Sequence, residues 1–548
     1  MAISEANAQH LSSKMNEPLL TSSSTASRSL TSFDEYGIGG GGSDIIEPNA
    51  AAAAIPPPPT FYTTGRTSSA FIFVCMLFYC INWIESDLMG AFIRSTIRCG
   101  NTTNNNATIY PPHSTKWSGS IYCHDKHFVL QEATHTQGTA TVVNRLLSIL
   151  ASVVLGPCSD TKGRKKFMVL SFFGYFLCCA LLYMHALLNI GTADANAPTT
   201  NGDELILFLA IGCSAAFSTF PVASHSMAAD VSQHSEASRG YIFTWLAMGK
   251  GFGTLIGFTG GFFVLRMCLT SYVNVWFMFT VVCLLAIFVS QCLLVETLET
   301  KTKQQRRRRR RQTISEQLEQ LDDFVDDEDD DEDEDERSST GCAALFRGAS
   351  LIVQDRFLFV FIFSTFLAIV GIYGTVSIVS SYLLGYGKGW VYSQATASLA
   401  GVFLPMAAIC GYLFSGLTIE RFGSKCVNML GKCIICIGLV VLGLFAHASP
   451  AWYWVGWEIV GFGFGCVTPT QGAVVSIRVH NRDQAKVLTI LLVVVSLGVA
   501  AGAWFWSNKL YDSTCVGRAC GVPFLWSAGV VLVSNVFFAA GWWIYERH

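Results

Sequence analysis

Long apolar runs alternate with short polar turns along most of this chain. Each run is close to the ~20 residues that an α-helix needs to cross a bilayer, whereas the strands of a membrane barrel are about half as long and alternate in polarity. The pattern therefore predicts an all-α membrane protein of twelve transmembrane helices. The runs lie at approximately 69–95, 138–158, 167–190, 204–229, 240–267, 274–297, 356–385, 393–417, 426–446, 450–477, 485–510 and 522–545.

Polar segments divide the chain into four parts. Residues 1–67 are polar with Gly- and Pro-rich stretches, and we expect a disordered cytoplasmic tail. Six predicted helices fall in 68–297 and six in 356–548. Between them, the linker 298–355 carries an arginine run followed by an acidic stretch, which we interpret as a solvated cytoplasmic segment. Contact with anionic lipid, or phosphorylation at Thr313 or Ser315, is the alternative.

Composition agrees with a polytopic membrane protein. Hydrophobic residues make up 51% and charged residues 14% of the chain, against about 25% charged residues in a soluble domain. The arginine run is too small a basic patch to indicate nucleic acid. No cleavable signal peptide and no clustered catalytic set are visible. We expect a monomer in the lipid bilayer that is not an enzyme and has neither cofactor nor metal.

A charged turn occurs twice in the same form. The first copy, GPCSDTKGRKK, contains Gly156, Asp160, Gly163 and Arg164 between two apolar runs. The second, GLTIERFGSK, contains Gly416, Glu420 and Gly423, and both 416 − 156 and 423 − 163 equal 260. A repeated turn in register predicts two similar halves, related by pseudo-symmetry, as in transporters.

Lysine and arginine predict the orientation, because they are enriched in short cytoplasmic loops. With the N-terminus inside, the inner turns hold Lys162, Arg164, Lys165, Lys166, Arg239, Arg421, Lys425, Arg478, Arg482 and Lys486, and the short outer turns hold Arg266, Lys388, Lys509 and Arg518. Both termini are therefore expected on the cytoplasmic side. The membrane that holds the protein is expected to be the plasma membrane or an endolysosomal or vacuolar membrane.

The loop at roughly 96–137 is then outside. It contains two acceptor sequons, at Asn101 and Asn106, which we predict to be glycosylated. Cys99 and Cys123 in this loop, and Cys515 and Cys520 in the last outer loop, would face an oxidising compartment. Their spacing does not fix how they pair.

The pattern G-x-x-x-D-x-x-G-R-K at 156–165 resembles the signature between the second and third spans of the major facilitator superfamily. The segment AADVSQHSEASRGYIFTW at 228–245 and the closing GVPFLWSAG at 521–529 are similar to tetracycline-antiporter-like members, and the first outer loop looks like that of proton-coupled folate transporters. The resemblance implies two six-helix halves and secondary transport of a small solute.

The residues of the turn have individual physical roles. Gly156 would allow two helices to approach closely, and Gly163 would permit the turn. Asp160 can face the N-terminus of a neighbouring helix, and Arg164 can pair with a carboxylate, for which Asp230 is the candidate. Together they would hold the two halves closed on the cytoplasmic side. The alternative is that the lysines and arginines only fix topology, and the second copy could be a weaker latch or a relic.

Ionisable groups within apolar runs are costly in lipid and are candidates for function. Asn82 and Glu85 are three residues apart and share a helix face. Arg145 lies at a similar depth in the next span, and an ion pair with Glu85 is the predicted arrangement, either as a static link or as a switching element. Lys250 lies near the middle of the fifth span, where it should face a central cavity and attract an anionic group.

Two further groups are candidates for proton binding. Glu458 lies near an aromatic cluster in the tenth span, and the alternative is a carboxylate hydrogen-bonded to tryptophan. His225 lies near the inner end of the fourth span, and a packing histidine is the alternative. The prediction from these observations is a secondary active transporter of a small organic solute, working by alternating access and coupled to protons through Glu458 or Glu85. A drug-type proton antiporter is one alternative. The glycine-rich fifth span resembles the glycine motif of that group, but it lacks the proline that the motif contains. A non-transporting receptor or tether is the other.

Overall fold

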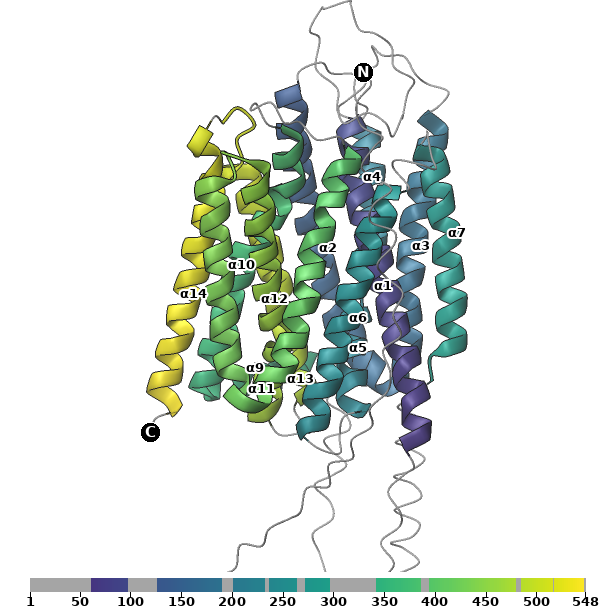
Figure 1. The fold of residues 1–548 in the computed structure, drawn as a ribbon. Coiled ribbons are helices and arrows are strands. Elements are labelled where there is room, and N and C mark those ends of the chain that lie inside the picture. Colours follow the sequence, from purple (N-terminus) through teal and green to yellow (C-terminus); the bar gives the residue numbers. More distant parts are fainter. Residues whose placement is uncertain are drawn as a thin grey trace, which may run out of the picture. The chain divides into compact units, whose positions relative to one another are not determined.

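A computed structural model describes residues 61–96, 126–189, 201–231, 236–263, 272–295, 342–385, 394–479, 484–515 and 517–546. Within these ranges the ordered elements are all helices (Figure 1), and they belong to one compact unit, Thr60–His548. The predicted sequons at Asn101 and Asn106, Cys99, Cys123 and most of the predicted tail and linker lie outside the described residues.

In the described residues, the first predicted half contains seven helices. They are α1 (Phe61–Thr96), α2 (Lys126–Lys162), α3 (Arg164–Asn189), α4 (Asn201–Ala216), α5 (Phe220–Val231), α6 (Glu236–Phe263) and α7 (Tyr272–Leu293). The expected fourth span is thus broken into α4 and α5. Pro221 follows the break, and α3 supplies side-chain partners for the freed backbone: Ser171 Oγ donates to the carbonyl of Phe217 at 2.8 Å.

The second half contains α10 (Arg356–Gly385), α11 (Gln394–Phe445), α12 (Pro450–Arg478), α13 (Gln484–Phe505), the π-helical turn η4 (Trp506–Leu510), the 3-10 turn η5 (Gly517–Gly521) and α14 (Val522–Glu546). Helix α11 joins two predicted spans at Gly423, whose φ of 78° and ψ of 154° are not helical. The repeated turn therefore forms a sharp bend in both halves, since Gly163 between α2 and α3 has φ 102°.

Twelve membrane-crossing segments result. Ten segments of the described chain are both long and apolar enough to span a bilayer, two of them within α11. The other two are α6 and α12, which have 28 and 29 residues, or roughly 42 Å at 1.5 Å per residue. Their glycines and aromatic residues lower their hydropathy but not their length. The predicted twelve-helix architecture is confirmed.

The helices turn an apolar face outward. On α7 the buried positions, which include Trp276, Phe279 and Cys283, follow helical spacing, whereas Phe277, Leu285 and Phe288 are exposed. Exposed phenylalanine and leucine along several helices would be anomalous in water but are expected in contact with lipid.

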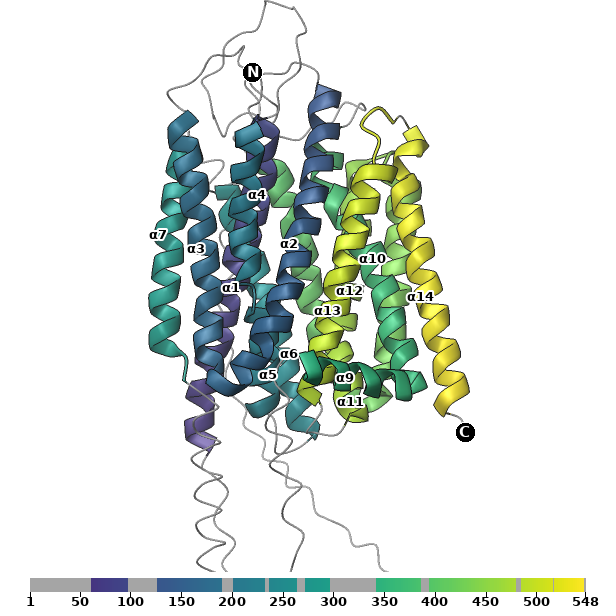
Figure 2. The same ribbon diagram turned by 180° about the vertical axis from the view of Figure 1, so that it is seen from behind.

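One helix falls inside the region that the sequence predicts as linker. Helix α9 (Cys342–Gln354) runs across the bundle at the end of α10 and α13 (Figure 2). It packs tightly there, because a Cβ atom on Gly348 would lie 2.8 Å from Ile490 Cδ1 on α13. The sequence did not predict this helix, because it is shorter than a membrane span, is of mixed polarity and directly follows a highly charged segment.

Glycine brings α6 against α1. Gly249, Gly253 and Gly257 recur every four residues on one face of α6, and each faces the backbone of α1. The closest approach is at Gly253, where a Cβ atom would lie 2.3 Å from the carbonyl oxygen of Met76. This small-residue face of the fifth span therefore packs on the first span.

Candidate functional site

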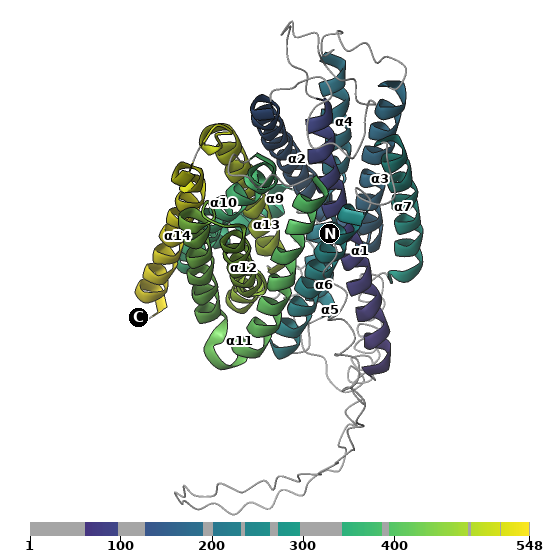
Figure 3. The same ribbon diagram turned by 45° about the horizontal axis from the view of Figure 1, so that its top comes forward.

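A cavity of about 400 Å³ lies between the two halves. Helices α1 to α6 line it on one side, and α10, α11, α12 and α13 on the other. The halves meet beside it, where α6 packs on α11 and α2 on α13. In Figure 3, with the top of the bundle tilted forward, α2 and α13 lie close to one another.

Helix α2 shows how the sequence builds the cavity wall. Thr141, Asn144, Arg145 and Ser148 repeat at helical spacing and line the cavity. The residues on the opposite face, Leu146, Leu150 and Val154, are exposed. An amphipathic helix orients its polar face away from lipid, so this pattern directs the arginine toward the cavity.

The structure brings Asn82, Glu85, Arg145, Lys250 and His225 to this one cavity. Asn82 and Glu85 share a face of α1, as expected. The carboxamide oxygen of Asn82 accepts a hydrogen bond from the Tyr175 hydroxyl at 2.5 Å. His225 donates from Nδ1 to the carbonyl of Pro221 at 2.7 Å, one turn earlier on α5.

Glu85 and Arg145 do not form the predicted ion pair in the described part of the structure. Glu85 is buried, and one of its oxygens lies 3.6 Å from the Cys178 sulfur, which donates to it. Arg145 lines the same cavity, but its Nε–H is buried without a hydrogen-bond partner. The two helices place both groups on the cavity wall without bringing their charged atoms into contact.

Lys250 lies over an aromatic ring. Its Nζ is 5.3 Å from the centre of the Tyr79 ring on α1, within range of a cation–π interaction. Such a contact offsets part of the cost of placing an ammonium in the membrane. The lysine lines the cavity, as its position in the fifth span suggests.

Glu458 is placed elsewhere. Its side chain is exposed and is not among the residues that line the cavity, whereas its neighbour Trp457 is. One residue along a helix turns a side chain by about 100°, which separates the two faces. Glu458 therefore takes no part in the site built here.

The charged turn, whose two copies define what we call the motif end of the bundle, has a buried arginine at its centre. Arg164 is 6% exposed and donates from a guanidinium nitrogen to the carbonyl of Ser226 on α5. The side chains of Asp160, Asp230 and Glu420 lie outside the described residues, so their pairing stays a prediction. A Cβ atom on Gly156 would meet Val222 at 3.6 Å, and one on Gly416 would meet Thr244 at 3.4 Å, so neither contact is unusually close.

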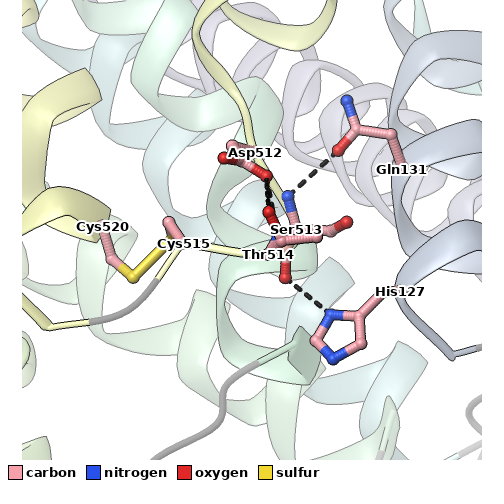
Figure 4. Close-up of a disulfide and its surroundings, with 7 residues drawn as sticks. All are labelled: His127, Gln131, Asp512, Ser513, Thr514, Cys515 and Cys520. Atoms are coloured by element: carbon pink, nitrogen blue, oxygen red, sulfur yellow. Dashed lines mark hydrogen bonds between the residues drawn. A yellow bond between two sulfur atoms is a disulfide. The ribbon is translucent and has the colours of Figure 1, made fainter.

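The opposite end carries a disulfide and a network between the halves. Cys515 and Cys520 are joined, beside the segment that follows α13 (Figure 4). Gln131 on α2 donates to the carbonyl of Tyr511 and accepts from the backbone N–H of Ser513, at 3.1 and 3.0 Å. His127 donates to the carbonyl of Ser513 at 2.7 Å. We call His127, Gln131 and their partners on this segment the disulfide-end latch.

Other bonds support this latch. Thr134 on α2 donates to the Ser381 hydroxyl on α10 at 2.6 Å, so α2 is tied to two elements of the second half. Asp512 accepts from the backbone N–H and the hydroxyl of Thr514, and these bonds hold the pKa of its carboxyl below the usual value. The sequence did not indicate this latch, because its bonds use backbone atoms and residues 380 or more apart.

Removing the Gln131 side chain should loosen the disulfide end. Gln131→Ala deletes two bonds between the halves, worth about 1 kcal/mol each. Ser507 lies buried in η4, close to the latch in sequence, and a cysteine there reports access from this end. The rate at which Ser507→Cys reacts with a membrane-impermeant thiol reagent from that side should rise by roughly tenfold or more. Glu132→Ala, at an exposed neighbouring position, is the matched control. Equal labelling rates in the two variants would mean that the latch does not restrict access.

A buried lysine in the second half was missed. Lys432 in α11 is fully buried, donates to the Ser364 hydroxyl at 2.5 Å and lies 4.9 Å from the centre of the Phe538 ring. It is not among the residues lining the cavity. A lone lysine in the apolar run 426–446 was the available signal. In the described segments no group of three His, Cys, Asp or Glu side chains is arranged to hold a metal ion.

Two halves of membrane-spanning helices around a shared cavity define the fold class of a solute transporter. The chain matches the Major Facilitator Superfamily over residues 114–503, and it belongs to that superfamily. No curated protein sequence matches the chain.

Solved structures share the fold. The human organic anion transporter MFSD10 (TETRAN) superposes with a TM-score of 0.57 at 13% identity, covering 88% of this chain and 100% of that one. The proton:xylose symporter XylE bound to 6-bromo-6-deoxy-D-glucose gives 0.58 at 15%, covering 88% and 96%. A bacterial homologue of the iron transporter ferroportin gives 0.54 at 11%, covering 87% and 98%. At these identities the likeness shows the fold alone.

Proposed function

We propose that the chain is a proton-coupled secondary transporter of a small organic solute that works by alternating access. The observation that carries this proposal is the position of the cavity, which both halves line. Tilting one half against the other would change which end of the cavity is open, without rebuilding either half. Two proteins that share the fold are an organic anion transporter and a proton:xylose symporter, which supports a small organic solute for this chain.

The two ends of the bundle would serve as opposing gates. The disulfide-end latch joins α2 to the second half at one end, whereas at the motif end the described bond of Arg164 ties α3 to α5 within the first half. We place the motif end in the cytoplasm, because its turns hold most of the lysine and arginine of the short loops. The disulfide supports an oxidising compartment at the other end. Glycosylation at Asn101 and Asn106 is part of this proposal, and so is a monomeric state.

Glu85 is the proposed proton site. It is a buried carboxylate on the cavity wall, and a proton bound there removes a charge from a medium that solvates it poorly. The groups around it are Cys178 and Tyr175 on α3 and Arg145 on α2. Because Arg145 makes no ion pair with Glu85 in the described structure, the carboxylate is not permanently locked and can exchange its proton.

Alternating access can be tested without knowing the solute. Thr134→Cys and Ser381→Cys, whose hydroxyls are hydrogen-bonded, should form a disulfide on oxidation and lock the disulfide end. A third cysteine in place of cavity residue Ser148 should react with an impermeant thiol reagent from either side before oxidation. After oxidation it should react only from the motif end. A receptor or tether with a fixed cavity predicts the same accessibility in both states, and that result would exclude transport by this mechanism.

Proton coupling is tested in proteoliposomes. Vesicles containing the full chain should take up a solute from a cell extract in response to a pH gradient, as detected by untargeted metabolite analysis. Glu85→Gln should lose this gradient-driven accumulation and retain exchange of the same solute, because the amide cannot bind a proton. Accumulation by Glu85→Gln equal to that of the wild type would place the proton site elsewhere.

A further inference from the structure

The charges around the cavity are unevenly distributed. Among the residues described as lining it, the charged side chains are Glu85, Arg145 and Lys250, and all three come from the first half. Two cations and one carboxylate leave this wall with an excess of positive charge. Proton binding to Glu85 would increase that excess.

Arg145 is the least satisfied of these groups. Its Nε–H is buried without a hydrogen-bond partner, and Glu85, the carboxylate that lines the same cavity, accepts a hydrogen bond from the Cys178 thiol instead. A cation in the membrane interior is costly, and the charge of Arg145 is compensated only in part, by its electrostatic interaction with Glu85 without an ion pair. Lys250 differs, because the Tyr79 ring already compensates part of its charge. The guanidinium is therefore the group best placed to gain from an anion that enters the cavity.

The opposite wall of the cavity, which the second half supplies, is uncharged and mostly apolar in its described residues. From the second half come Tyr373, Trp457 and an aliphatic surface to which Val376, Leu404, Leu491 and Val499 contribute. Polar groups on this wall, such as Ser377 and Gln471, are uncharged. A solute that fits between the walls needs a charged end on one side and an apolar body on the other.

We propose that the solute is an amphipathic organic monoanion. Its carboxylate or equivalent group binds the guanidinium of Arg145, with Lys250 adding electrostatic attraction, and its apolar body lies against the wall formed by α10, α12 and α13. A neutral solute would leave the guanidinium unpaired, and an organic cation would meet two like charges. This inference rests on the proposed transport function and names the class of its substrate.

Isosteric ligands test the charge requirement. The probes are indole-3-acetate, its neutral amide indole-3-acetamide, and tryptamine, which share one ring system but differ in charge. Benzoate with benzamide, and acetate as an anion without an apolar body, complete the series. Binding to the purified full chain is measured as the rise in thermal unfolding temperature at millimolar ligand. The two aromatic carboxylates should stabilise the protein, and the amides, tryptamine and acetate should have little effect.

Substitutions then test the residue. Arg145→Gln should weaken binding of the stabilising carboxylates by about ten- to a hundredfold, the loss of a charge-assisted hydrogen bond. Lys250→Gln should weaken it less, because the lysine is shared with Tyr79. Lys166→Gln, which removes an exposed cation outside the cavity, is the control. Each purified variant must first show the unfolding temperature of the wild type without ligand, and Arg145→Lys replaces Arg145→Gln if the latter does not fold.

Several results would overturn this substrate class. They are equal stabilisation by an amide and its carboxylate, preference for tryptamine, no stabilisation by any carboxylate, or unchanged binding in the Arg145 variant. Failure of the proposed function is a separate result, since it appears as unchanging accessibility of the Ser148→Cys probe. If cavity access alternates but the protein prefers amides, the proposed transport function stands and the proposed anionic substrate class is wrong.

Discussion

Arg164→Ala is expected to reduce transport to background, while Lys166→Ala retains close to wild-type transport. Arg164 is buried and donates to a backbone carbonyl on α5, whereas the Lys166 side chain is exposed two residues later on α3. A hydrogen bond made by a charged donor contributes about 1.5–3 kcal/mol, and because this one lies within the first half, its loss should loosen the packing of α3 on α5 that a closed motif end requires.

The comparison is made in proteoliposomes with equal amounts of inserted protein, by following exchange of a solute identified from the cell extract. Arg164→Lys should restore only part of the activity, because an ammonium lacks the planar fork of the guanidinium. If the two alanine variants transport equally well, the arginine acts only through topology, and the gating role of the motif must be abandoned.

Gly253→Leu is expected to abolish folded protein. A Cβ atom at this position would lie 2.3 Å from the carbonyl oxygen of Met76 on α1, which is a backbone atom and cannot rotate away. Separating α1 from α6 would also disturb the cavity wall, since Tyr79 and Lys250 lie on these two helices. Overpacking of this kind costs about 1–3 kcal/mol or more, and a leucine adds further bulk to the first clash.

Size-exclusion chromatography in mild detergent measures this effect as the yield of monodisperse protein. The matched control is Gly260→Ala on the same helix, where a Cβ atom would have its nearest contact at 3.4 Å, from Ile84. Normal yield and stability of Gly253→Leu would show that the two helices are less closely packed than described.

Hydropathy and repetition were sufficient to predict the fold. Length and apolar character located all twelve spans, because each helix that crosses lipid must satisfy its own backbone and expose apolar side chains. The constant offset between the copies of the charged turn indicated two halves. Gly163 and Gly423 are equivalent positions in the two copies of this turn, and both have positive φ angles. The break between α4 and α5 was not predicted, since it depends on side chains that α3 contributes.

Most residues of the candidate site could also be predicted from the sequence. Asn82, Glu85, Arg145, His225 and Lys250 were each chosen because polar groups in an apolar run must avoid lipid, and in this fold that requirement directs them to one cavity. Glu458 met the same criterion but is exposed outside the cavity. Which face of a helix turns inward depends on its neighbours, and the sequence of one helix does not specify them.

The sequence by itself determined that this chain crosses the membrane twelve times in two similar halves, and which apolar runs carry charge. The tertiary structure alone decided the pairing of these charges: it separated Glu85 from Arg145, placed Lys250 over Tyr79 and buried Lys432 beside Ser364. It also joined α2 to the segment after α13 through backbone atoms of Tyr511 and Ser513. The physical reason is that hydropathy acts on each residue separately, whereas a hydrogen bond or an ion pair needs two atoms within a few ångströms, at positions that only packing sets.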